Sequence, residues 1–150
     1  MNAILLFGLL ALLAGALIPV QAAANAALSK SLQGNVAVSA VILFVVAGVI
    51  ACAAVLLSGA KIPSLKQFAA APTWSYIGGV IVAIYVLTIT FLVPRIGVGP
   101  AISLIVTGQI MAALIIDQFG LLGALQFSLT TGRIIGAILM ITGVFLTTRR

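Results

Sequence analysis

The sequence predicts an all-α integral membrane protein, and three observations support this fold class. Of the 150 residues, 64% are hydrophobic and only 5% are charged, whereas soluble domains carry about 25% charged residues. Apolar runs recur along the chain, each long enough to cross a bilayer as a helix of roughly 20 residues. The runs are apolar on every face, which favours helices over the alternating strands of a membrane barrel. We therefore predict a single membrane domain, residues 1–150, with five transmembrane helices.

The first helix is expected over residues 3–28, with a bend near Pro19 because proline removes a backbone hydrogen bond. Gln21 and Asn25 are four residues apart and share a face of this helix. Two roles are open to these amides. They line a transport pathway, or they form hydrogen bonds that hold two membrane helices together.

The second and third helices are expected over residues 35–57 and 73–93, with a basic loop at residues 58–66. Trp74 lies at the start of the third helix, where interfacial aromatic residues usually occur. One stripe of this helix, at spacings of four and three, carries Trp74, Gly78, Ile81, Tyr85 and Thr88. Trp74 and Tyr85 are candidates for the aromatic wall of a cavity, and the alternative is ordinary helix packing.

The fourth helix is expected over residues 99–116. Gln109 lies alone among aliphatic residues in this helix, and, like Gln21 and Asn25, it either lines a transport pathway or forms a hydrogen bond between helices. Asp117, the only acidic residue, follows this helix. It is a candidate for binding a cation or a proton at the mouth of a pathway, or for pairing with Arg133. Arg133 in turn either contacts an anionic substrate or anchors its helix at the membrane surface.

The fifth helix is expected over residues 130–148, after a membrane-surface connector at residues 121–129. Gly132, Gly136 and Gly143 follow one another at spacings of four and seven. Such a seam of small residues lets the backbones of two membrane helices approach closely. We interpret it as a contact with another helix or with a second copy of the chain.

The composition also excludes several classes of function. The chain has no histidine, one acidic residue and one cysteine, Cys52. These residues cannot form an acid–base pair, a Ser-His-Asp triad or a metal site, so we predict no enzyme activity, metal or cofactor. The net charge of +6 is spread over the ends of the apolar runs. This placement predicts contact with lipid headgroups rather than with nucleic acid.

The positive charges give almost no bias to the orientation of five helices. One side of the membrane receives three of them, Lys61, Lys66 and Arg133, and the other receives four, Lys30, Arg95, Arg149 and Arg150. A difference of one charge is too small for the positive-inside rule to determine the orientation of the chain in the membrane. Either another factor determines the orientation, or the chain inserts both ways and forms an antiparallel dimer of identical chains.

Four segments together resemble one transporter family. They are Gly15…Pro19-x-Gln21…Asn25, Trp74…Gly78-Gly79, Gly108-Gln109…Asp117-x-Phe119-Gly120 and Arg133…Gly136…Gly143. In order and spacing they resemble the five-helix, YdcZ-like branch of the drug/metabolite transporter superfamily. The resemblance implies a multi-pass protein of the bacterial inner membrane, working as half of an inverted-repeat transporter of ten helices. The chain is also similar to the four-helix small multidrug exporters, but its first helix lacks their membrane-embedded glutamate.

From these features we expect a secondary transporter that moves a small organic solute by alternating access, as an antiparallel homodimer in the lipid bilayer. The alternative is a membrane subunit without transport activity that binds and stabilises a partner membrane protein.

Overall fold

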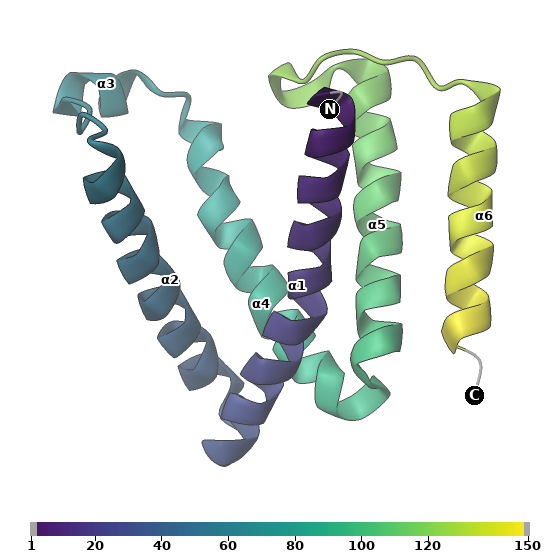
Figure 1. The fold of residues 1–150 in the computed structure, drawn as a ribbon, viewed down its shortest axis with the longest axis horizontal. Helices are drawn as coiled ribbons and strands as arrows, with labels where there is room; N and C mark the ends of the chain where they lie inside the picture. Colours follow the sequence, from purple (N-terminus) through teal and green to yellow (C-terminus); the bar gives the residue numbers. More distant parts are fainter. Residues whose placement is uncertain (1–2, 149–150) are drawn as a thin grey trace. The chain divides into compact units, whose positions relative to one another are not determined.

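The computed structural model describes residues 3–148, and the ordered elements in this range are all helical (Figure 1). The long helices are α1 (Ala3–Ser31), α2 (Val36–Ser58), α4 (Ile77–Ile96), α5 (Val98–Phe119) and α6 (Thr131–Thr148). The short elements are α3 (Leu65–Ala70) and the 3₁₀ helices η1 (Thr73–Tyr76) and η2 (Leu121–Gly123). Arg149 and Arg150, which entered the charge count, lie outside the described residues.

Four helical segments of the described chain are long and apolar enough to cross a membrane. They are Ile4–Ser31, Val36–Ser58, Thr73–Ile96 and Val98–Phe119. The fifth helix is shorter in its apolar part, which covers Thr131–Leu146. The helical membrane class is therefore confirmed, with four spans that meet the length of a hydrocarbon core and one shorter apolar helix.

The first and fourth predicted helices end three residues too early, since α1 continues to Ser31 and α5 continues through Asp117 to Phe119. The third predicted helix differs from the structure at both ends. It begins as the 3₁₀ helix η1, and α4 then continues through Pro94 to Ile96, three residues beyond the predicted end at residue 93. Proline has no backbone N–H, so one carbonyl in the preceding turn loses its helical hydrogen bond. In membrane helices, neighbouring groups can supply a donor to such a carbonyl. The connection to α5 is correspondingly shorter than expected. It consists of Gly97 alone, whose φ of 89° suits a residue without a side chain.

The basic loop between the second and third spans contains a helix that the sequence did not predict. The short helix α3 begins after Ser64, whose backbone N–H donates to the side-chain oxygen of Gln67 at 2.8 Å. This contact satisfies one of the free donors at the start of a helix. The Tyr76 hydroxyl donates to the Phe68 carbonyl at 2.9 Å, which joins α3 to η1. Local hydrogen bonds therefore form a helix that begins within the loop predicted at residues 58–66.

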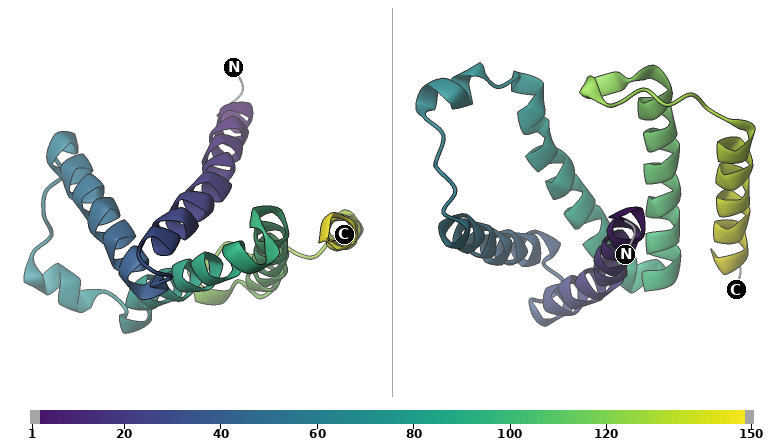
Figure 2. Two further views of the ribbon diagram at one scale, coloured as in Figure 1. Left: turned by 90° about the horizontal axis from the view of Figure 1, so that it is seen from below. Right: turned by 45° about the horizontal axis from the view of Figure 1, so that its top comes forward.

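The chain divides into two compact units, residues up to Pro94 and residues from Arg95 onward. In the first unit α1, α2 and α4 converge where α1 ends, α2 begins and α4 ends, and they spread apart toward their other ends (Figures 1 and 2). The buried side chains of this unit lie at the convergent end: Ala22, Asn25, Ala26, Ser29, Ser39, Ala40, Val86, Ile89, Thr90 and Val93. Small residues dominate the α1 and α2 part of this core, as expected where membrane helices approach closely.

The second unit is built on the antiparallel pair of α5 and α6, which pack against each other. The segment between them folds back over the end of α5, in the green to yellow part of Figure 1. Gly120 ends α5 in the left-handed conformation, with φ 59°, and this is the usual way for glycine to terminate a helix.

Candidate functional site

Asn25 lies in the core of the first unit and joins two helices. Its side chain is only 4% exposed, and its Nδ2 donates a hydrogen bond to the Oγ1 of Thr90, which is fully buried on α4. Ala22 and Ala26 on either side of Asn25 are also buried, so α4 can approach this part of α1. The observed hydrogen bond matches the helix-joining role that the sequence left open for Asn25.

Sequence reasoning missed Thr90. The stripe of spacings four and three on the third span pointed to Thr88, which is exposed, whereas its neighbour Thr90 is buried. Both threonines lie in a predominantly apolar segment, so the sequence contains no clear polar face that would distinguish them. The only available signal was the presence of a hydroxyl group in an apolar span, since such groups favour an interhelical partner.

Gln21 lies in a groove of about 430 Å³ between α1 and α2. Gln21 and Asn25 are the only polar residues among those that line it. The full lining is Gln21, Ala24, Asn25 and Leu28 from α1, with Ile42, Leu43, Val46, Ala47 and Ile50 from α2. An apolar groove with a few polar groups is the usual form of a site for small molecules. The structure therefore brings together the two α1 amides that the sequence singled out.

The other candidates on the spans are not among the residues that line this groove. Trp74, in η1, is 51% exposed, and Tyr85 on α4 is half-buried; neither contributes to the groove lining. Gln109 is exposed on α5, while Thr107 on the same helix is half-buried and donates to the Ser103 carbonyl at 2.9 Å. The Thr107 hydroxyl is thus satisfied within its own helix.

Asp117 and Arg133 form an ion pair in the second unit, between the Asp117 Oδ2 and an Arg133 guanidinium nitrogen. Arg133 also donates to the Phe127 carbonyl at 3.1 Å, and the Phe127 N–H donates to the Asp117 carbonyl at 2.8 Å. The pair therefore closes a ring of contacts across the α5–α6 connector. This arrangement is the pairing that the sequence left open as one of two roles for Asp117.

Gln118 forms two further hydrogen bonds with the same connector. Sequence reasoning did not identify Gln118. Its Oε1 accepts from the Leu129 N–H at 2.6 Å, and its backbone carbonyl accepts from the Gln126 side chain at 3.0 Å. The connector is exposed along residues 121–130, so these polar contacts, rather than apolar burial, hold its path.

The glycine seam of α6 is partly covered, since Gly136 and Gly143 are half-buried and Gly132 is exposed. A Cβ atom added at Gly136 or Gly143 would meet nothing within 4 Å, and one at Gly132 would meet only the Thr130 hydroxyl at 4.0 Å. The contact between α5 and α6 therefore does not use these glycines as a close backbone approach.

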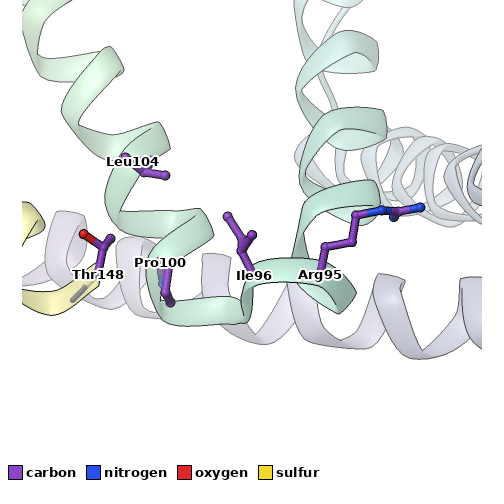
Figure 3. Close-up of a pocket in the computed structure, with 5 residues that line it drawn as sticks. All are labelled: Arg95, Ile96, Pro100, Leu104 and Thr148. Atoms are coloured by element: carbon purple, nitrogen blue, oxygen red, sulfur yellow. The ribbon is translucent and has the colours of Figure 1, made fainter. Parts of the chain in front are cut away.

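A smaller hollow of about 310 Å³ lies where α5 begins. Figure 3 shows Pro100, Leu104 and Thr148 around it, with the Arg95 side chain directed away from Pro100 and Thr148. The guanidinium charge thus does not point toward these residues. In the described part of the chain, no cluster of three or more His, Cys, Asp or Glu side chains could hold a metal ion.

A comparison with protein families agrees with this architecture. The model of the family described as "Putative inner membrane exporter, YdcZ" matches residues 6–146, nearly the whole chain. Searches of curated proteins and of solved structures gave no significant match. The family description and the apolar helices together indicate a membrane transporter rather than an enzyme. The chain belongs to the YdcZ family and is a multi-pass protein of the inner membrane.

Proposed function

We propose that this chain transports a small organic solute by alternating access, and that it works as an antiparallel homodimer in which the two units of each copy form one membrane domain. The observation that carries the proposal is the open end of the first unit. Residues 4–18 of α1, 45–58 of α2 and 77–82 of α4 are all exposed, whereas the opposite ends of these helices share a core.

A unit that is narrow at one end and wide at the other packs efficiently against an inverted copy of itself. The wide end of each copy then receives the narrow end of its partner, and the splayed helices gain neighbours. Small residues at the wide end suit this contact, since Gly8, Gly15, Gly48 and Gly78 have no atom within 4 Å of an added Cβ. A parallel dimer would place two wide ends together and leave both narrow ends apart.

Inverted copies also provide a physical basis for alternating access. Two halves related by an axis in the membrane plane exchange conformations when the site opens to the other side. The charge count of three against four supports insertion in both orientations, because it gives neither side a clear excess of Lys and Arg. The Gln21 and Asn25 groove supplies a polar position inside an apolar span.

The first test is orientation. A reporter active only in the cytoplasm and one active only outside it are fused, separately, to the C-terminus. Both should be active at similar expression, since the chain would insert both ways. As a matched control, a Lys61→Gln and Lys66→Gln double variant leaves one charge against four and should favour the cytoplasmic reporter. Activity of one reporter alone in the unmodified chain would contradict the antiparallel homodimer.

The second test is transport itself. Liposomes containing the purified chain are loaded with a mixture of neutral, cationic and anionic small organic solutes. At least one solute should leave faster than from liposomes without protein, and its flux should saturate with concentration. Release equal to that of protein-free liposomes for every solute would contradict transport, and flux that does not saturate would indicate a channel.

A further inference from the structure

We infer that the groove between α1 and α2 is the solute site and that it selects uncharged molecules with an apolar body and one hydrogen-bonding group. This inference rests on the transporter proposed above and names its class of substrate. It follows from the groove's size, its lining, the state of its two amides and the position of the charges of the chain.

The size and lining of the groove determine the body of the solute. Its volume of about 430 Å³ falls within the range of roughly 300–1,000 Å³ found for sites that bind small molecules. Seven of the nine lining side chains are aliphatic: Ala24, Leu28, Ile42, Leu43, Val46, Ala47 and Ile50. Aliphatic side chains stabilise a bound molecule through the hydrophobic effect, which has no preferred direction. The solute must therefore have an apolar surface to place against them.

The two amides of the groove differ in their capacity to form a hydrogen bond with a solute. The Asn25 Nδ2 already donates to Thr90. Within residues 3–148 the Gln21 side chain has no hydrogen-bond partner in the structure, and it is only half-buried. Gln21 precedes Lys30 by nine residues, or about 14 Å along a helix. With Lys30 at the interface, the Gln21 amide lies near the middle of the hydrocarbon, where a polar group strongly favours a hydrogen-bond partner.

The charge of the groove lining determines the net charge of the solute. No residue lining the groove is charged. Asp117, the only acidic side chain of the sequence, is paired with Arg133 in the other unit. A cation would therefore enter the groove without a carboxylate, and an anion would lie about 14 Å from Lys30. Both would lose hydration without gaining a counter-charge, which is the costly case at membrane depth.

The test is protection of a cysteine placed in the groove. Cys52 is the only cysteine, so Cys52→Ser gives a background without thiols. Ala47→Cys then adds a thiol to the groove lining, and Val49→Cys adds one to α2 outside it. The rate of alkylation by N-ethylmaleimide is measured in proteoliposomes of the full chain, with three solutes that share a benzene ring. They are neutral benzamide, cationic phenyltrimethylammonium and anionic benzoate.

Benzamide should slow alkylation of the Ala47→Cys variant several-fold and leave that of the Val49→Cys variant unchanged. At the same concentration, phenyltrimethylammonium and benzoate should change neither rate. Equal protection by a charged solute, or no protection by benzamide, would overturn the inference. An Ala47→Cys thiol that does not react, and that instead forms a disulfide with a second copy, would overturn it as well, because the groove would then be a dimer contact.

Two further variants test Gln21 directly. Gln21→Leu in the Ala47→Cys chain should abolish protection by benzamide while the thiol remains reactive. Gln21→Glu, which keeps the shape of the side chain, should give protection by phenyltrimethylammonium. If neither substitution alters which solute protects, Gln21 does not recognise the solute.

Counterflow in the same liposomes separates this inference from the proposed function. Protection by benzamide without benzamide counterflow would leave the site in place and contradict transport. Saturable flux of a charged solute without protection of the groove thiol would leave transport in place and contradict the site.

Discussion

Asn25 on α1 and Thr90 on α4 are buried polar residues in the core of the first unit. Their hydrogen bond connects α1 to α4 in a region where the neighbouring residues are small or aliphatic. Interhelical hydrogen bonds in membrane proteins average only about 0.6 kcal/mol and reach about 1.7 kcal/mol. The bond therefore contributes modestly to stability, and its larger effect is to determine which faces of the two helices meet.

A double-mutant cycle with Asn25→Leu and Thr90→Val measures this bond. We expect a coupling energy of about 0.6–1.7 kcal/mol, measured by unfolding the purified chain in mixed micelles with increasing denaturing detergent and following its circular dichroism. Thr88→Val is the matched control, because Thr88 is exposed, and it should change the free energy of unfolding by less than about 0.5 kcal/mol. Additive effects of Asn25→Leu and Thr90→Val would show that the bond does not stabilise the unit.

At the scale of elements, the α5–α6 connector is held by polar contacts at its two ends. Arg133 contacts both Asp117 and the Phe127 carbonyl, and the planar guanidinium suits two simultaneous acceptors. The Arg133 and Asp117 side chains are 33% and 29% exposed, so solvent weakens the ion pair. This geometry favours a role in fastening the hairpin over a role in binding solute.

Arg133→Lys tests that role, because lysine keeps the positive charge but lacks the planar guanidinium that can donate to two acceptors at once. For a partly exposed pair worth about 0.5–1 kcal/mol, local opening of the connector should increase about two- to fivefold. Limited proteolysis within residues 121–130 measures it, and Lys66→Gln, in the helix α3, should leave the rate unchanged. Unaltered proteolysis together with lost transport would instead place Arg133 in the pathway.

At the scale of the whole molecule, the half-buried glycines of α6 provide a test of association between copies. A Cβ atom at Gly136 or Gly143 would meet no neighbour within 4 Å in the single chain. If this seam contacts a second copy, Gly136→Leu should reduce the dimer association constant by at least about tenfold, since the backbones could no longer approach closely.

Crosslinking of the purified chain in detergent, at several protein concentrations, measures this constant. Ile138→Leu is the control on the same helix, because Ile138 is exposed, at 57%, and lies outside the seam. A Gly136→Leu chain that associates as strongly as the unmodified chain would show that the seam faces lipid.

The sequence by itself determined the membrane class and the approximate limits of the spans. Lipid provides no hydrogen bonds to a backbone, so long apolar runs must become helices whatever their neighbours are. It also identified Asp117 and Arg133 as possible partners, because an isolated acid and a nearby arginine flank one connector. The ends of the first, third and fourth spans were each wrong by three residues. The helix α3 was missed because local hydrogen bonds form it within a segment that the sequence predicted as a loop.

Only the tertiary structure decided which faces of the helices meet. A helix in lipid is apolar all round, so its sequence lacks the polar stripe that marks the exposed side of a soluble helix. The choice of Thr90 over Thr88 as the partner of Asn25, and the groove beside Gln21, therefore became visible only in three dimensions. Close packing of small residues at the narrow end of the first unit selects these contacts, and it depends on how side chains from separate helices fit together.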